Sequence, residues 1–411
     1  MTRFISFGTY LPPWQLGNRR VKGPDEDALT MAVAAGRAAD PAMSAQRVVL
    51  VTRDFPLLEG GNGAALLAGL SLAQTIPVTE VLGGGPAVLD QILQSGPGTL
   101  VVAADDNESA VGAAAALVGE ADSGCELLAV GRRTGSLPMQ ARGADGARHL
   151  YADPRLQREI GVRSALPHLG LSRSEPIVAV AGVKTSELGN GFDTAAASND
   201  PSPGSAAVIR LIAAAAEDAQ EGVVLAVEHA SIGAALLREG PTAPRVTRDE
   251  APARELPKLR TTVGNGIPIS LPAYARAFEP KLRWEAAVFD DNSGVDDVPL
   301  TPPRLRVSPA GELLNYRLSP LPRTGAIYTQ TTIRIPVPDL PGPYSLAVVE
   351  LDDSPVRVLL KLTGVPAGEA NIGQHGSVVL RRIATRAGIP DYGYMFWPGK
   401  LENLESAGAL R

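Results

Sequence analysis

Short apolar runs alternate with segments of helical spacing over the first 240 residues. QRVVLVTRD, GTLVVAAD and PIVAVAG are apolar runs with β-branched residues, which is typical of strands that are covered on both faces. DEDALTMAVAAGRAAD begins with acidic residues and then repeats apolar residues at helical spacing, which predicts a helix. GVVLAVEHASIGAALLREG is expected to form two strands in a hairpin-like pair. A second series of such elements begins near residue 150, so we expect a layered α/β fold with two similar halves.

The pattern changes twice after residue 240. Residues 241–300 are rich in proline and charge, which predicts a linker with one short helix. From residue 301 the runs are short and alternating, with turn residues between them, which is typical of a small all-β barrel. We therefore expect an α/β domain over residues 1–240, a linker over 241–300 and a β-barrel domain over 301–411.

Composition narrows the possible partners. The formal net charge is -6, whereas a nucleic-acid-binding protein usually has a basic face. No apolar run approaches the roughly 20 residues that a membrane span needs. The N-terminus also lacks the long apolar core of a secretory signal, so we expect a cytoplasmic protein without a nucleic acid or membrane partner. The single cysteine, Cys125, allows no internal disulfide and no cysteine-built zinc site, and we interpret it as a small buried hydrophobic residue.

Two parts of the chain resemble known families. Residues 1–240 resemble the thiolase superfamily, in the branch of 3-hydroxy-3-methylglutaryl-CoA synthase and ketoacyl synthase III, through FISFGTYLPPWQL, GGGPAVLDQIL and PGSAAVIRLIAAA. Residues 300–400 resemble the DUF35 family, an OB-fold usually preceded by a zinc ribbon, through RTGAIYTQTTI, NIGQHGSVVLRRI and YGYMFWP. The resemblance implies a thiolase-like α/β fold followed by an OB-fold barrel.

The resemblance also implies where catalytic residues would lie, and the chain departs from that pattern. In the resembling enzymes a cysteine at the start of a buried helix is the nucleophile, and Leu82 falls at its place. The family's histidine would follow PIVAVAG, where this chain has Val183. Asn199 lies near the place of the family's asparagine, but the loop is longer, so that Ser202 or Pro203 is an alternative. We therefore expect no catalytic residues at these degenerate positions.

Metal binding is also unexpected. The places of the zinc-ribbon cysteines hold residues such as Val307, Ser308 and Gly311, so no tetrahedral thiolate site can form. Four aspartates between residues 290 and 297 lack the regular alternation and the terminal glutamate of a calcium loop. We interpret them as a loose acidic loop. Its members are Asp290, Asp291, Asp296 and Asp297.

The leading hypothesis is a non-catalytic subunit of an acyl-CoA-processing thiolase or acyltransferase complex. In this hypothesis the chain docks to an active thiolase-like partner, to a second copy of itself, or to both, and helps to form the acyl-CoA channel. The resemblance implies pairing through the strand GTLVVAAD and its neighbours. Acyl-CoA would be a ligand of the complex, with no zinc and no covalently bound cofactor.

Two alternatives remain open. The first is an acyltransferase or hydrolase with non-standard residues such as Ser202, Ser205 or His229, although a serine needs a base within hydrogen-bond reach and the sequence shows no such pair. His229 by itself is interpreted as a polar tip at a strand end. The second alternative is an acyl-CoA carrier or sensor. In this alternative, the residues expected to contact the CoA phosphates are Arg357, Lys361, Arg381 and Arg382.

Overall fold

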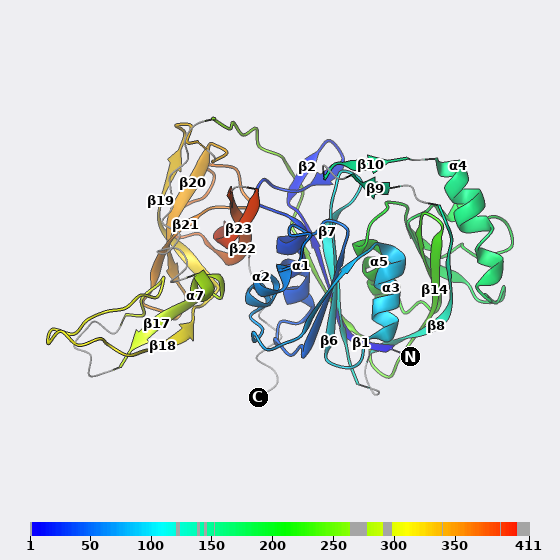
Figure 1. Ribbon diagram of the computed structural model, residues 1–411, viewed down its shortest axis with the longest axis horizontal. Coiled ribbons are helices and arrows are strands. Elements are labelled where there is room, and N and C mark those ends of the chain that lie inside the picture. Colours follow the sequence, from blue (N-terminus) through cyan, green and yellow to red (C-terminus); the bar gives the residue numbers. More distant parts are fainter. Residues whose placement is uncertain are drawn as a thin grey trace. The chain divides into compact units, whose positions relative to one another are not determined.

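The computed structural model divides into two compact units, each described here by itself (Figure 1). Unit 1 contains residues 1–12, 34–63 and 75–251. Unit 2 contains residues 13–33, 64–74 and 252–411, so two segments from the first part of the chain group with the C-terminal part. The structure describes residues 2–120, 124–137, 140–143, 146–151, 153–263, 278–290, 298–338, 340–386 and 388–400.

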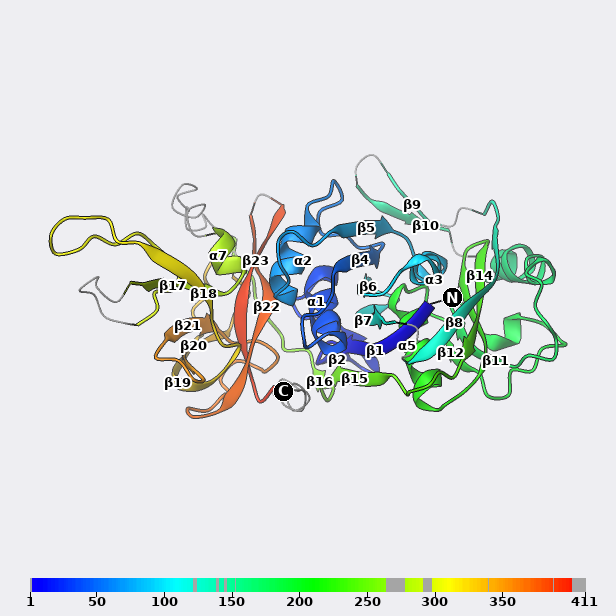
Figure 2. The same ribbon diagram turned by 90° about the horizontal axis from the view of Figure 1, so that it is seen from below.

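Unit 1 is built on a mixed sheet whose strands form two sets with the same order. The first set contains β1 (Thr2–Leu11), β4 (Arg47–Thr52), β5 (Val78–Leu82), β6 (Thr99–Asp106) and β7 (Val111–Val118). The second set contains β8 (Cys125–Thr134), β11 (Ile177–Ala181), β12 (Ser198–Asp200), β13 (Gly222–Glu228) and β14 (Ser231–Arg238). The spatial orders β1-β7-β6-β4-β5 and β8-β14-β13-β11-β12 are equivalent, and Figure 2 shows the first of them. This equivalence confirms the predicted duplicated α/β architecture.

The strand directions repeat as well. β4 is parallel to β5 and β6, and β6 is antiparallel to β7. β11 is likewise parallel to β12 and β13, and β13 and β14 form the predicted antiparallel pair. The two sets join where β8 pairs with both β14 and β1. β15 (Arg245–Glu250), from the stretch expected to be a linker, adds a parallel strand beside β1.

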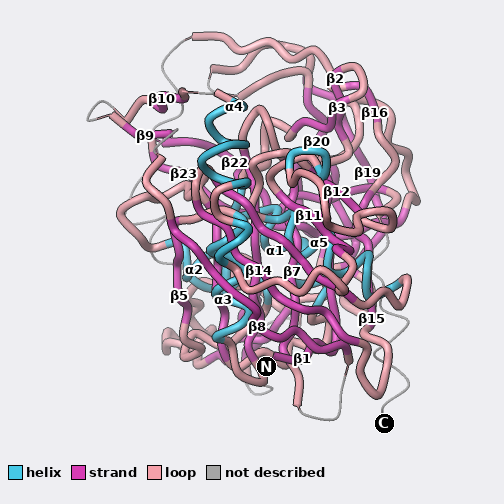
Figure 3. The backbone as a smooth tube through the Cα atoms, turned by 90° about the vertical axis from the view of Figure 1, so that its right-hand side faces the viewer, coloured by secondary structure: helices cyan, strands magenta, loops and turns pink. Residues whose placement is uncertain are grey.

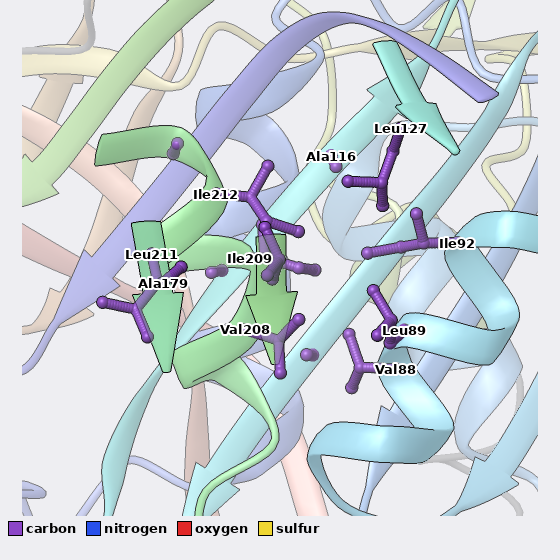
Figure 4. Close-up of a cluster of buried hydrophobic side chains, with 14 of the residues drawn as sticks. Val88, Leu89, Ile92, Ala116, Leu127, Ala179, Val208, Ile209, Leu211 and Ile212 are labelled. Carbon is purple, nitrogen blue, oxygen red and sulfur yellow. The ribbon is translucent and has the colours of Figure 1, made fainter. Parts of the chain in front are cut away.

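Two central helices occupy equivalent places in the two halves. α3 (Gly85–Gln94) connects β5 to β6, and α5 (Ala206–Glu217) connects β12 to β13. Val88 and Leu89 of α3 and Val208 and Ile209 of α5 belong to one buried cluster between the helices (Figure 4). Burial of each such side chain stabilises the fold by roughly 1.5–3 kcal/mol, so this contact fixes the two helix starts relative to each other.

Outer helices cover the remaining faces of the sheet. In the second half α4 (Pro154–Leu156), the π-helical turn η1 (Gln157–Arg163) and the 3-10 turn η2 (Leu166–His168) lie over β13 and β14 (Figure 3). η3 (Thr185–Glu187) follows β11, and β9 (Gln140–Arg142) pairs with β10 (Arg148–Leu150). α1 (Ala28–Ala39) forms where the sequence predicted a helix, and α2 (Asn62–Leu70) follows β4 along the chain. Gly8 lets β1 approach the end of α1, because a Cβ there would collide with the carbonyl oxygen of Ala35.

Unit 2 is dominated by the predicted small barrel. Its five antiparallel strands follow the order β21-β20-β19-β22-β23. A bridge between Leu362 and Phe396 connects the chain just after the first of these strands to the last, which nearly closes the barrel. The strands are β19 (Thr324–Ile333), β20 (Tyr344–Leu351), β21 (Arg357–Lys361), β22 (His375–Arg386) and β23 (Ile389–Pro398).

A two-stranded ribbon stands where the resemblance implied a zinc ribbon. β17 (Glu285–Phe289) pairs with β18 (Tyr316–Pro320) after the short helix α7 (Phe278–Leu282). The ring centroids of Phe289 and Tyr316 lie 5.6 Å apart, and the guanidinium of Arg306 lies 5.4 Å from the ring centroid of Phe289. Aromatic and cation–π packing therefore stabilises this ribbon. A three-stranded sheet also belongs to unit 2 and consists of β16 (Arg254–Glu255), β2 (Trp14–Leu16) and β3 (Arg19–Val21).

Candidate functional site

The turn between β5 and α3 is the place where the resemblance implied a nucleophile. Leu82 is the last residue of β5, and its side chain is 67% exposed. Gly83 and Gly84 follow, and Gly84 is the N-cap of α3. The backbone at the helix start is therefore glycine, and the assignment of the nucleophile's place to Leu82 stays a prediction.

An internal ion pair fills the space beside this turn. Glu228, the last residue of β13, accepts a hydrogen bond from the backbone N–H of Gly84 at 3.1 Å through Oε2. Its carboxylate also pairs with the guanidinium of Arg53, which follows β4. A Cβ on Gly84 would collide with both side chains. Because a helix N-terminus favours an anion, the start of α3 stabilises the carboxylate of Glu228.

The start of α5 is capped in the corresponding way. Asp105 of β6 accepts hydrogen bonds from the backbone N–H groups of Ser205 at 2.6 Å and Ala206 at 2.9 Å. Burial raises the pKa of the Asp105 carboxyl, while these two hydrogen bonds and Arg210 oppose the shift. The hydroxyl of Ser205 donates to the carbonyl oxygen of Gly83 at 3.0 Å, so this bond joins the starts of the two central helices.

His229 lies beside the ion pair in an uncommon backbone conformation. Its φ is +54°, in the left-handed region that few residues other than glycine adopt. Its Nε2 lies 3.8 Å from Oε1 of Glu228. Burial, and then the positive charge of Arg53, lower the pKa of the imidazole, so His229 is neutral at pH 7. The hydroxyl of Ser205 is directed to Gly83, and the described contacts contain no hydrogen bond between His229 and a serine.

The other predicted degenerate positions have structural contacts. Val183 is buried just after β11. The side-chain amide of Asn199, in β12, donates to the carbonyl oxygens of Val180 at 3.0 Å and Val183 at 2.6 Å. The structure therefore brings Asn199 and Val183 together, and this amide holds the end of β11 against β12.

Cys125 shows no sign of an activated thiol. It is buried at the start of β8, and burial raises the pKa of its thiol to about 12. A reactive cysteine needs a lowered pKa and some exposure, so the thiol is an inert core group. The described residues also contain no group of three potential metal ligands, and of the predicted acidic loop Asp291, Asp296 and Asp297 lie outside them.

One of the four cations expected to contact CoA is internal. Arg381 is 2% exposed and pairs with Asp25 at 3.8 Å and with Glu26 at 3.5 Å. Its guanidinium also lies 5.3 Å from the ring centroid of Trp397. Arg381 is thus a buried group that pairs inside its own unit, and its role in CoA binding stays a prediction.

The other three cations have different partners. Arg357 pairs with Glu350 at 2.8 Å and lies 3.8 Å above the ring of Tyr328. Lys361 lies 5.1 Å above the ring of Tyr344, and burial lowers the pKa of its amine. Arg382 donates to the carbonyl oxygen of Pro24. Their role in CoA binding stays a prediction.

The strand GTLVVAAD is excluded as an edge for pairing with a partner. It forms β6, which pairs with β4 on one side and β7 on the other. Its backbone groups are therefore used inside the sheet, and the implied pairing through β6 itself was wrong. β5 pairs only with β4 within the described residues, which makes β5 the outer edge of the first half.

Sequence reasoning missed the three charged residues of the helix starts. Asp105, Arg53 and Glu228 each follow or end an apolar run: GTLVVAAD, QRVVLVTRD and GVVLAVE. An ionisable residue at the end of a fully buried strand is a signal that could have identified them. Its carboxylate or guanidinium lies at the end of the strand, next to the N-terminus of a helix.

The comparisons with known proteins agree with this architecture. Residues 319–381 match the family model described as "ChsH2, C-terminal OB-fold domain". The barrel of unit 2 is thus an OB-fold domain of the ChsH2 type. No curated protein matches the chain.

Solved structures similar to the chain are condensing enzymes. The 3-oxoacyl-[acyl-carrier-protein] synthase III of Aquifex aeolicus is 16% identical, with a TM-score of 0.46, over 58% of this chain and 100% of that chain. OleA of Xanthomonas campestris, in a structure with bound lauric acid and lauroyl-CoA, is 13% identical, with a TM-score of 0.48, over 57% of this chain and 98% of that chain. Unit 1 is thus an α/β domain with a duplicated mixed sheet, and unit 2 contains a barrel of which residues 319–381 match the ChsH2-type OB-fold model.

Proposed function

We propose that the chain is a non-catalytic subunit of an acyl-CoA-processing thiolase or acyltransferase complex. The observation that carries the proposal is the ion pair of Glu228 and Arg53 at the start of α3. A thiolase-type reaction needs a nucleophile and an oxyanion site at this place. Here Leu82 is expected at the place of the nucleophile, and the chain's own Glu228 carboxylate accepts a hydrogen bond from the N–H of Gly84, the N-cap of α3.

The retained scaffold supports a role in assembly. The buried cluster between α3 and α5 and the duplicated sheet are intact, so loss of chemistry has left the fold well packed. Among the described residues β5 has a neighbouring strand on one side only, and such an edge can be extended by a strand from another chain. The partner of this edge would be an active thiolase-like subunit or a second copy of this chain.

The OB-fold domain would contribute to acyl-CoA binding in the complex. This part of the proposal rests on the sequence resemblance and on the match of residues 319–381 to the ChsH2-type domain. β21 holds the exposed Arg357 and the partly buried Lys361, each above a tyrosine ring. These cations would lie beside the acyl-CoA channel, while the nucleophile and base would come from the partner.

The alternative of an acyltransferase or hydrolase within this chain has little geometric support. Ser205 donates its hydroxyl hydrogen to a backbone carbonyl, so it is not activated by a base. His229 is neutral and could accept a proton, but the charged groups beside it are Arg53 and Glu228, whose Oε1 lies 3.8 Å from its Nε2. A general base acts on a proton within about 2.6–3.2 Å.

The test is to purify the chain from its native host and to assay it both as the isolated chain and in complex with its partner. The isolated chain should neither transfer nor hydrolyse the acyl group of acyl-CoA thioesters. The complex should contain a thiolase-like subunit with its own cysteine and histidine, and its turnover should disappear when that cysteine is alkylated. Turnover by the isolated chain that survives purification to homogeneity, and that falls in a His229→Ala variant, would overturn the proposal.

A further inference from the structure

A cavity of about 600 Å³ lies in the second half of unit 1. It is formed where the end of η1, the turn η2 and the loop after η3 meet. A volume of this size is within the range of small-molecule sites, which is roughly 300–1,000 Å³. The starts of α3 and α5 are occupied by the carboxylates of Glu228 and Asp105. This cavity, in contrast, is open.

Four leucine and phenylalanine side chains form the apolar part of the cavity wall. Leu166 and Leu188 are each 3% exposed and belong to the buried cluster beneath the outer helices. Leu171 and Phe192 are partly buried and pack against the same cluster. The cavity therefore opens directly onto the hydrophobic core of this half, and an apolar group that enters it would be removed from water.

Two guanidinium groups converge on the loop that forms the mouth. Arg163, from the end of η1, has its Nε 3.8 Å from where a Cβ on Gly189 would lie. Arg173, from the segment before β11, has its Nη1 2.6 Å from where a Cβ on Gly191 would lie. Both glycines have positive φ, +84° and +104°, so the backbone of this loop leaves room for the two side chains.

The charge of this mouth is incompletely balanced. Arg163 shares Glu159 with Arg158. Arg173 lies 6.0 Å from the ring centroid of Phe192, and within the described residues it has no hydrogen bond or ion pair with a carboxylate. The nearby side chain of Asn190 adds an amide at the rim. An apolar cavity thus has a cationic mouth whose guanidinium forks match a carboxylate or phosphate.

The cavity is separate from the filled helix starts. Ile177 is the first residue of β11. Its N–H donates a hydrogen bond to the carbonyl oxygen of Asp193 in the loop at the cavity mouth. β11 and β13 are parallel, and Ile177 pairs with Val223 near the start of β13. Glu228 ends the same strand, which has seven residues, or roughly 20 Å of strand at about 3.3 Å per residue. The two places lie at opposite ends of β13.

We propose that this cavity binds an amphipathic organic anion. Its carboxylate or phosphate group lies between Arg163 and Arg173, and its apolar part lies against Leu171 and Phe192. Free fatty-acid-like carboxylates and phosphate esters of apolar alcohols share this chemistry. The proposal goes beyond the proposed function and does not depend on it.

The test is calorimetric titration of the full chain with three eight-carbon probes: octanoate, octyl phosphate and 1-octanol. We expect one molecule of octanoate or octyl phosphate per chain, and at least tenfold weaker binding of 1-octanol, which has no charge. Tighter binding of octanoate assigns the site to carboxylates, and tighter binding of octyl phosphate assigns it to phosphate esters. Absence of saturable binding by both anions would overturn the proposal.

The variants locate the binding. Arg173→Gln removes the charge from an exposed side chain and should weaken anion binding at least tenfold, with the remaining affinity lost in the Arg163→Gln, Arg173→Gln double variant. Arg155→Gln is the matched control, because Arg155 lies on α4, is 82% exposed and does not line the cavity. Equal affinities in all of these variants would place the anion elsewhere and refute the site. A thermal melt of each variant confirms that it is folded before titration.

Discussion

Asp105 and Glu228 are carboxylates from equivalent strands, and each caps the central helix of the opposite half. Asp105 ends the buried part of β6 in the first half and accepts hydrogen bonds at the start of α5. Glu228 ends β13 in the second half and accepts a hydrogen bond at the start of α3. The duplication thus extends from the sheet order to the electrostatics of the helix starts.

The ion pair at the start of α3 should be energetically coupled. Arg53 and Glu228 have side chains that are 15% and 19% exposed. Glu228→Gln leaves the guanidinium without its charge partner, and we expect a loss of about 1–3 kcal/mol in the free energy of unfolding, because partial exposure reduces the roughly 3–5 kcal/mol of a fully buried broken pair.

A double-mutant cycle with Arg53→Gln and Glu228→Gln, measured by urea unfolding, tests this coupling. The double variant should be less destabilised than the sum of the single variants. Strict additivity would mean that the pair contributes nothing as a pair, and the interpretation of Glu228 as a stabilising occupant of the helix start would be wrong.

Asp105 should give the stability a dependence on pH. Burial raises its pKa in the folded state above the ordinary value of 3.8, so the folded protein holds the proton more tightly than the unfolded chain. The stability from that proton is fully present below the unfolded pKa and is lost as pH rises through the raised folded pKa. Asp105→Asn removes this titration. Urea unfolding at a series of pH values from 3.5 upward should therefore show the wild type losing stability relative to Asp105→Asn as pH rises. A constant difference across the series would contradict the raised pKa.

Most of the scaffold was predictable because its signal is local. Buried strands such as PIVAVAG and helices such as α5 are encoded in short stretches, and the repetition of these stretches predicted two halves. The caps were not predictable in this way, because Gly84 and Glu228 are 144 positions apart. Arg381 and Arg382 show a second limit. They look alike in the sequence, but neighbouring residues of a strand face opposite sides, so one is buried and the other reaches the surface.

The edge strand β5 should carry the proposed docking. Pro77 and Gly83, at its two ends, bond to β4, and alternate residues direct their backbone groups to opposite sides. The backbone groups of Leu82 therefore point to the free edge, beside a side chain that is 67% exposed. Leu82→Lys places a charge at an apolar interface, and we expect at least tenfold weaker association with the partner subunit and an unchanged melting temperature.

The control for this edge is Ile160→Lys. Ile160 is an exposed apolar residue of η1, 47% accessible, in the second half of the unit. Association is measured by size-exclusion chromatography with light scattering on the purified complex. Equal weakening by both substitutions, or by neither, would remove β5 from the proposed interface.

The buried cation of the OB-fold unit should be structural and should not bind CoA. Arg381→Met removes the guanidinium that pairs with the carboxylates of Asp25 and Glu26, and breaking such a buried pair costs about 3–5 kcal/mol. Arg357→Met removes an exposed pair with Glu350, for which about 0–1 kcal/mol is expected. Urea unfolding of the two variants gives the comparison, and titration of each with acyl-CoA separates stability from binding. If Arg381→Met matched Arg357→Met in stability, the guanidinium would not be holding residues 25 and 26 against the barrel, and the hydrogen bonds from Thr363 to Asp25 and from Tyr392 to Asp27 would hold this segment instead.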